Sequence, residues 1–353
     1  MKIISESEKY AKNIQPDKTK NPGNVALFQK PGADTSKIVG GCMAYSKIRE
    51  KELVPHIDRL GGIIRDRSSH LWYSPSGLGK SLFAMNSAWA MATGGDFLGW
   101  TTGGKKYRVL YLDGEMSERQ LKNRFADIEI ASNSSYDSDS TTPENLVVYN
   151  LDFLEGDYFF NLASNKDRVE AQPLFDKFDV IIVDNIASLC FGLKENESQS
   201  WAALNHWTVM QKRRGKTIIF VHHSGKNGDY RGSSDLLRPH EVVISLDRPV
   251  NYKPSDGARF VVNFEKARDL SGEIVAPFEA RLTTSDLGIQ QWERVDIEKN
   301  TYEIIIQWAN SGMSPGEIAT ELKKNRSGVY RHINKAKSEG RLPEDYAARG
   351  RKR

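Results

Sequence analysis

Residues 74–81 read SPSGLGKS and come close to a phosphate-binding pattern: Gly, four residues of any kind, then Gly-Lys-Ser or Gly-Lys-Thr. Ser74 stands where the first Gly is expected. Backbone N–H groups in such loops surround the β-phosphate, so the chain must turn tightly and approach the ligand closely. Gly77 and Gly79 remain where a side chain would most obstruct that approach, and Ser74 followed by Pro75 can close the turn. We therefore expect an ATP site whose phosphate-binding residues are Ser76, Gly77, Leu78, Gly79, Lys80, Ser81 and Leu82.

Lys80 and Ser81 supply the charge and the hydroxyl that a triphosphate with Mg²⁺ needs. Lys80 can neutralise the β- and γ-phosphates, and Ser81 can bind the metal. Later in the chain DVIIVD (residues 179–184) is an apolar, strand-like run that ends in a carboxylate. Asp184 can hold the Mg²⁺ water shell as a Walker B aspartate does, although an aspartate at a strand end can also cap a helix. The metal site is therefore predicted at Ser81 and Asp184.

Hydrolysis also needs a group that orients or deprotonates the attacking water. Asn185 rather than Glu follows Asp184, so this base must come from another strand. Glu115 lies just past the strand-like run RVLYLD, and the carboxyl ends of parallel strands meet at one ligand crevice. Asp113 is the alternative base, but as a strand residue it can instead face a neighbouring strand. Glu115 is the favoured prediction.

Two histidines end a third strand-like run, KTIIFVHH. Adjacent strand residues face opposite ways, so one of them lies at the crevice and the other points into the sheet. The pattern favours His223 as the catalytic residue that reads the γ-phosphate and passes its presence to the following loop, and His222 as the inward residue.

These residues require a sheet that brings several strand ends together. Strand-like runs alternate with helix-like runs from HLWYS to KTIIFVHH, which is typical of an α/β domain with a twisted, mostly parallel sheet. Ser117 and Gln120 form a capping box that begins the helix after RVLYLDGEM. ASNSSYDSDSTTPEN (residues 131–145) is expected to be a polar loop.

The chain is long enough for one large domain and a small second one, at 353 residues with 39% hydrophobic residues. We expect a flexible arm (1–32), an ATPase domain (33–298), a helical domain (299–342) and a basic tail (343–353). Two distant cysteines indicate neither a disulfide framework nor a zinc site. No apolar run approaches the roughly 18 residues of a membrane span, and a reducing cytoplasm is the expected location.

The motifs that carry a resemblance to a known family are the phosphate loop, LDGEMS, VDN, HHSGK and RGSS. Through these motifs the chain resembles the RecA-type hexameric helicases over about residues 60 to 275. The likeness is strongest to the plasmid RepA helicase family and weaker to the DnaB family. The resemblance implies a RecA-like P-loop NTPase core, a ring of six subunits with ATP between neighbours, and single-stranded DNA in the central channel. It also implies that Lys266 and Arg268 of FEKARDLSG extend into the adjacent subunit's site, with Arg238 as the second candidate for that role.

The resemblance further implies that Arg124 packs on the adenine. Residues 191–200 and the loop with Lys226 and Arg231 would face the channel, where the two cations contact the phosphates of a single strand without reading sequence.

Residues 301–341 carry a pattern of three short helices that resembles a helix-turn-helix domain. Ser314 and Pro315 begin one helix as N-cap and first residue, and Gly340 ends the last one. Residues 299–353 hold 12 Lys/Arg against 6 Asp/Glu, a charge of +6, so the other residues carry 38 against 40, or −2. This charge favours DNA, duplex DNA included, over a protein-docking role. The DNA-facing residues expected on the last helix are Arg326, Ser327, Tyr330, Arg331, Lys335 and Lys337.

The sequence therefore favours an ATP-dependent DNA helicase or translocase of plasmid- or phage-type replication. Two alternatives stay open: an ATPase that binds DNA without unwinding it, such as a recombination mediator, and a sequence-specific DNA-binding regulator that its ATPase core assembles.

Overall fold

The computed structural model describes residues 40–135, 143–156, 158–194, 197–225 and 234–346. The expected N-terminal arm and basic tail lie outside these residues, except for 343–346. Residues 1–55 and 56–353 form two separate units. In the first, helix α3 (Tyr45–Glu50) is exposed along its whole length. The second unit carries the sheet, the predicted site and the C-terminal helices.

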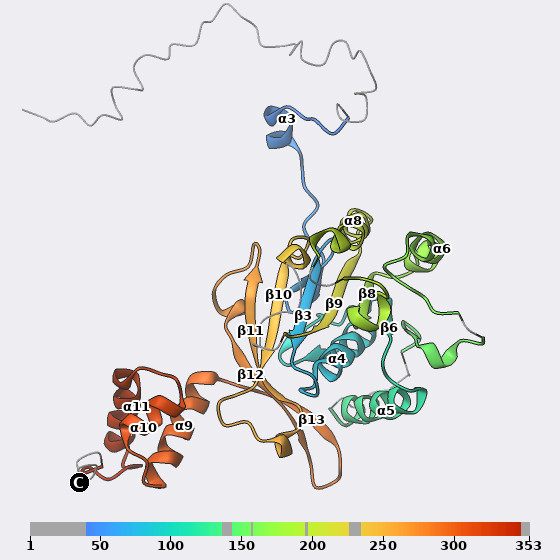
Figure 1. Ribbon diagram of the computed structural model, residues 1–353. Coiled ribbons are helices and arrows are strands. Elements are labelled where there is room, and N and C mark those ends of the chain that lie inside the picture. Colours follow the sequence, from blue (N-terminus) through green and yellow to red (C-terminus); the bar gives the residue numbers. More distant parts are fainter. Residues whose placement is uncertain (1–39, 136–142, 157, 195–196, 226–233, 347–353) are drawn as a thin grey trace, which may run out of the picture. The chain divides into compact units, whose positions relative to one another are not determined.

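A nine-stranded sheet runs through the second unit in the order β13-β12-β11-β10-β3-β9-β8-β6-β7 (Figure 1). Neighbours from β7 to β10 pair in parallel, whereas β11, β12 and β13 extend the sheet in antiparallel pairs. The strands are β3 (Ser69–Ser74), β6 (Val109–Asp113), β7 (Leu146–Tyr149), β8 (Val180–Asp184), β9 (Thr217–His223), β10 (Val242–Asp247), β11 (Arg259–Ala267), β12 (Phe278–Thr284) and β13 (Gln290–Val295). The expected α/β class with a mostly parallel sheet is confirmed.

Helices cover both faces of this sheet, so its central strands are buried and rich in β-branched residues, as β8 (VIIVD) illustrates. Helices α4 (Lys80–Thr93) and α5 (Glu118–Ser135) pack on one face, where Trp72 and Phe83 belong to one core. On the other face Leu71 and Tyr73 share a second core with α6 (Asn165–Phe175) and α8 (Ser198–Arg213). Alternate residues of β3 thus serve opposite cores.

Helix α5 begins where the capping box places it, because the Ser117 backbone N–H donates to Gln120 Oε1 at 2.9 Å. It runs on to Ser135, so the expectation of a loop from residue 131 is wrong for residues 131–135. The Ser132 hydroxyl donates to the Ile128 carbonyl at 2.8 Å, which satisfies a polar side chain within the helix. Residues 136–142 lie outside the described part of the chain.

Short elements complete this unit. Two small antiparallel pairs are β1 (Asp58–Leu60) with β2 (Ile64–Arg65) and β4 (Asp96–Phe97) with β5 (Trp100–Thr101). Helix α7 (Ile186–Leu189) follows β8, and single 3₁₀ turns occur at Leu151–Phe153, Ser234–Leu237, Pro254–Asp256 and Gly272–Val275.

Three C-terminal helices form a core of their own. They are α9 (Ile297–Asn310), α10 (Pro315–Glu321) and α11 (Arg326–Ser338). Helix α10 begins as expected, with Ser314 as N-cap and Pro315 first, and Glu317 completes a capping box. The apolar side chains that α10, its C-cap and α11 contribute to this core are buried: Ile318, Ala319, Leu322, Val329, Ile333 and Ala336.

Phe83 is the most informative core position to test, since it lies one turn after Lys80 on α4 and is fully buried. Its ring contacts those of Trp72 and Phe97 at centroid distances of 5.0 and 5.3 Å. Phe83→Ala should lower the free energy of unfolding by about 3–5 kcal/mol because it leaves a cavity. Urea unfolding measures this, with the 87% exposed Leu287 as control: Leu287→Ala should stay within about 0.5 kcal/mol. Equal effects of both substitutions would contradict the packing described here.

Candidate active site

The phosphate loop joins the end of β3 to the start of α4. Gly77 and Gly79 both have positive φ, at 76° and 107°. A Cβ on Gly79 would lie 2.7 Å from the Ala258 Cβ, so this position needs glycine on two counts. Buried Ser74 takes the place of the first glycine without obstructing the loop, because its hydroxyl turns back to the Pro75 carbonyl at 2.9 Å.

Lys80 begins α4, and only 6% of it is exposed. It lies near the carboxylates of Asp184 and Glu115. Burial lowers the pKa of Lys80, the charges of Asp184 and Glu115 raise it, and Arg124 lowers it further. A buried ammonium at a helix N-terminus, next to a loop with two glycines of positive φ, is a suitable partner for phosphate oxygens. The residues present therefore fit a nucleoside triphosphate.

Asp184 ends β8 and is brought together with Ser81, as the sequence predicts. Its Oδ2 accepts a hydrogen bond of 2.6 Å from the buried Tyr111 hydroxyl, and Ser81 also hydrogen-bonds to it. Burial raises the pKa of Asp184, while these two hydrogen bonds and Lys80 oppose the rise. A carboxylate and a serine hydroxyl side by side are oxygen ligands of the kind Mg²⁺ takes, so the pair fits the metal.

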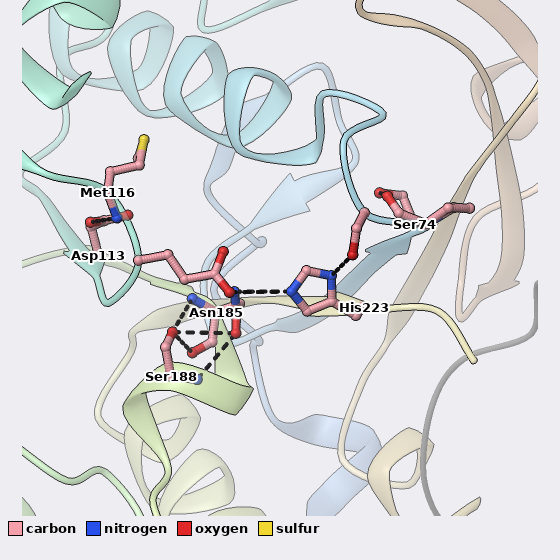
Figure 2. A network of polar contacts seen from close by, with 9 residues as sticks. Ser74, Asp113, Met116, Asn185, Ser188 and His223 are labelled. Carbon is pink, nitrogen blue, oxygen red and sulfur yellow. Dashed lines mark hydrogen bonds and ion pairs between the residues drawn. The ribbon is translucent and has the colours of Figure 1, made fainter. Parts of the chain in front are cut away.

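Asp113, the alternative base, faces a neighbouring strand and is 1% exposed. It lies opposite Asp184 in the β6–β8 register, and its Oδ2 accepts from the Met116 N–H at 3.0 Å (Figure 2). The same oxygen accepts from the Asn150 amide at 2.7 Å. Burial, helped by the Asp184 charge, raises the pKa of Asp113 to about 7. Its carboxylate thus braces the turn after β6 instead of facing the phosphates.

Glu115 follows that turn and points toward His223. Its Oε1 lies 3.3 Å from His223 Nε2, and the carboxylate is 48% exposed. Burial raises the pKa of Glu115, but hydrogen bonds from Asn185 and His223, with the charges of His223 and Lys80, outweigh this and lower it. Glu115 is therefore ionised at neutral pH and can accept a proton.

His223 links β9 to the phosphate loop as well as to Glu115. Its Nδ1 lies 3.1 Å from the Ser76 hydroxyl, and its Nε2 lies 3.4 Å from the Asn185 amide nitrogen (Figure 2). His222 faces the other way, fully buried with its ring 6.3 Å from that of Trp201. This is the arrangement that strand alternation predicts.

Sequence reasoning did not assign Tyr111, Asn150 or Asn185 to the site. Asn185 caps α7, where its Oδ1 accepts from the Ser188 N–H at 3.2 Å, and so turns its amide nitrogen to His223. The signal that could have found it is its place directly after the Walker B strand. Tyr111 and Asn150 carry no such local signal, because their partners are distant in sequence.

Of the other expected site residues, Leu78, Leu82 and Arg124 stay near Lys80, whereas Lys266 does not. Leu78 is buried, Leu82 is half-buried, and the Arg124 guanidinium donates to the Met116 sulfur at 3.2 Å. Lys266 lies at the amino end of β10, the edge opposite the phosphate loop, where its Nζ donates to the Leu237 carbonyl at 2.8 Å.

Arg268 is exposed at that same opposite edge. Arg238 is 78% exposed and pairs with Asp235 at 2.7 Å. Neither these arginines nor Lys266 belong to the chain's own phosphate site, and a role in a neighbour's site stays a prediction.

The predicted DNA-contacting residues divide into two groups. Lys226 and Arg231 lie outside the described residues, as do 195–196 of the 191–200 segment. Arg326, Ser327, Tyr330, Arg331 and Lys335 are exposed on α11 and Lys337 is half-buried, with Lys335 4.8 Å from the centre of the Tyr302 ring and 3.9 Å from Glu339.

Comparison with known proteins settles the family. The model of the AAA_25 family, described as an AAA domain, matches residues 48–229. The chain belongs to this family. With the strand order and phosphate loop described above, the match confirms a RecA-like P-loop ATPase fold, a class that binds nucleotide, usually with Mg²⁺.

Two solved structures from archaea are similar to this AAA_25 protein at 15% identity. The flagellar accessory protein FlaH from Methanocaldococcus jannaschii matches with a TM-score of 0.45, over 68% of this chain and 99% of its own. The KaiC-like protein PH0186 from Pyrococcus horikoshii OT3 matches with a TM-score of 0.43, over 67% and 94%. No curated protein sequence matches the chain. Among the helices described here, none has the length and apolar character to cross a bilayer.

Asp113 makes stability depend on pH. Its folded-state pKa of about 7 exceeds the ordinary value of 3.8, so the stabilisation it gives at low pH is lost as the pH rises through about 7. Asp113→Asn keeps an acceptor for Met116 and Asn150 but cannot ionise. The free energy of unfolding of the variant should therefore exceed that of the natural protein by a margin that grows with pH. This margin should rise from near zero at about pH 4 to about 4 kcal/mol at about pH 8. Urea unfolding without nucleotide or metal checks this, and a gap that is constant with pH would contradict it.

Proposed function

We propose that the protein is an ATP-driven DNA helicase or translocase that works as a ring, with each ATP site completed by the adjacent subunit. The observation that carries the ATPase part is the convergence of Lys80, Ser81, Asp184 and Glu115 at the carboxyl edge of the parallel strands. The helicase part rests on the resemblance to RecA-type hexameric helicases and on the cationic elements described below.

These four groups divide three tasks in hydrolysis. Lys80 binds the β- and γ-phosphates and offsets their charge. Ser81 and Asp184 hold Mg²⁺, which when bound neutralises charge on the phosphate oxygens. Glu115, kept ionised by its hydrogen bonds, orients the attacking water and accepts its proton. His223 holds the Glu115 carboxylate from the phosphate-loop side.

The location of Lys266 and Arg268 favours a ring over a monomer. They lie at the sheet edge opposite the chain's own phosphate loop, so they can approach a γ-phosphate only in another subunit. In a head-to-tail ring one edge of each subunit faces the other edge of the next. Arg268 is exposed and can supply the charge that an arginine finger supplies, an effect of roughly 10³ to 10⁵ in rate.

Lys80→Ala should abolish ATP turnover, because the phosphates lose their buried cation. Glu115→Gln should leave ATP bound and slow hydrolysis by about 10² to 10⁴ fold, since an amide cannot accept the proton. Steady-state phosphate release and nucleotide-binding fluorescence measure the two effects, with the exposed Lys105→Ala as control.

Natural protein that hydrolyses no ATP in the presence of single-stranded DNA would refute the proposal. A forked-duplex assay separates the candidate functions: turnover without strand separation would favour a DNA-binding ATPase that does not unwind.

The C-terminal helices provide a second candidate DNA contact. Lys323, Lys324, Arg326 and Arg331 cluster around the turn between α10 and α11, exposed and without an ion-pair partner among the residues that the structure describes. Tyr330 is 44% exposed beside them. By contrast, Arg341 pairs with Glu303 at 2.7 Å, and Lys335 lies against Tyr302 and Glu339. The α10–α11 turn therefore carries the free positive charge that phosphates attract.

This contrast yields a matched pair of substitutions that remove the same charge. Arg331→Ala should weaken duplex DNA binding and lower the slope of log affinity against log salt by about 1. Lys335→Ala should do less, because Glu339 and Tyr302 already engage this cation. Fluorescence anisotropy over a salt series measures both, and equal losses would show that the α10–α11 turn is not the preferred contact.

A further inference from the structure

The pairing of β3 with β9 places His223 beside the phosphate loop. Ser74 and His223 are partners in this parallel register, and the Ser224 N–H donates to the Ser74 carbonyl at 2.8 Å. The two strands therefore end together, and the loop that leaves β3 passes the imidazole. Ser76, two residues into this loop, lies 3.1 Å from His223 Nδ1.

The hydrogens of this network can be assigned from the groups themselves. Ionised Glu115 only accepts hydrogen bonds, so the His223 Nε2 at 3.3 Å must carry the proton between them. With Nε2 donating to Glu115, the Ser76 hydroxyl can donate to Nδ1 of a neutral imidazole or accept from Nδ1 of a charged one. In either state the contact with Ser76 holds the His223 ring with its Nε2 toward Glu115.

Asn185 supports this assignment from the other side. Its Oδ1 accepts from the Ser188 N–H in the α7 cap, so its NH₂ faces Glu115 and His223. An NH₂ cannot accept from a protonated Nε2, and it donates instead to the Glu115 carboxylate. Two donors, from β9 and from the start of α7, therefore fix the carboxylate of Glu115.

We propose that Ser76 is a positioning residue that connects the phosphate loop to Glu115 through His223. The inference rests on the proposed ATPase function and goes beyond it. Because the backbone around Ser76 surrounds the phosphates, a shift of the loop on nucleotide binding moves the partner of Nδ1. The imidazole moves with it, and so does the donor that holds Glu115. Nucleotide bound in the loop thereby sets the orientation of the Glu115 carboxylate, without direct contact between His223 and the γ-phosphate.

Removing the Ser76 hydroxyl should change turnover without unfolding the protein. Ser76 is exposed, and removing an exposed hydroxyl usually changes stability by less than about 0.5 kcal/mol. Threonine keeps a hydroxyl at this position, so Ser76→Thr is the conservative variant of the test.

The experiment compares steady-state ATP turnover and ADP affinity of the full chain in Ser76→Ala, Ser76→Thr, His223→Ala and the double variant Ser76→Ala/His223→Ala. Ser76→Ala should lower kcat about 10-fold, a part of the roughly 10² to 10⁴ that a positioned base contributes, with KM and ADP affinity within about 2-fold. Ser76→Thr should recover most of the loss. The double variant should match His223→Ala, because both changes interrupt one chain of contacts. Ser271→Ala, at an exposed serine outside the site, is the control.

Natural turnover in Ser76→Ala would overturn the inference and favour direct reading of the γ-phosphate by His223. Additive losses in the double variant, or no recovery with threonine, would overturn it as well. If the unaltered protein binds ATP without hydrolysing it, the proposed function fails, and the inference fails with it. The two failures are distinguishable, because in the second case the unaltered protein and Ser76→Ala hydrolyse ATP at the same rate.

Discussion

Parallel pairing of β3, β9, β8 and β6 is the constraint on which the site depends. Parallel strands in register end at the same edge, and the residues just beyond their ends become neighbours whatever their separation in sequence. Asp184 is opposite Asp113 on one side and Val221 on the other, while His223 is opposite Ser74. The backbone hydrogen bonds of the sheet therefore set the spacing of the chemical groups, and the side chains need only small adjustments.

Burial gives these groups different electrostatic tasks. Asp113 and Asp184 are almost fully buried, and neither is compensated by charge alone. Asp113 is stabilised by the Met116 N–H and the Asn150 amide, and it still has a raised pKa, whereas Glu115 is partly exposed and well supplied with donors. Solvent access and hydrogen-bond donors thus give Asp113 and Glu115, two residues apart, different pKa shifts and different functions.

Local sequence patterns were sufficient for much of this arrangement. The phosphate loop, the strand end at Asp184, the place of Glu115 just past β6 and the opposite directions of His222 and His223 follow from motif spacing and the two-residue strand period. The contacts of Tyr111 with Asp184 and of Ser76 with His223 could not be predicted, because they depend on which strands are neighbours. The same limit applies to Lys266, whose place at the far edge follows from the antiparallel return of β11. At α5 the polar composition of residues 131–135 concealed a helix, in which the Ser132 hydroxyl is satisfied by the Ile128 carbonyl.

The Tyr111 hydroxyl also restricts how Asp184 could meet a metal ion. It donates to Oδ2 of Asp184 at 2.6 Å, and both groups are almost fully buried. An oxygen that already accepts a hydrogen bond is less available to a cation, so the other carboxylate oxygen would make the contact. Mg²⁺ usually keeps several of its own waters, and a carboxylate with one free oxygen fits that requirement. A phenol on the neighbouring strand thus sets which oxygen of Asp184 would face the metal.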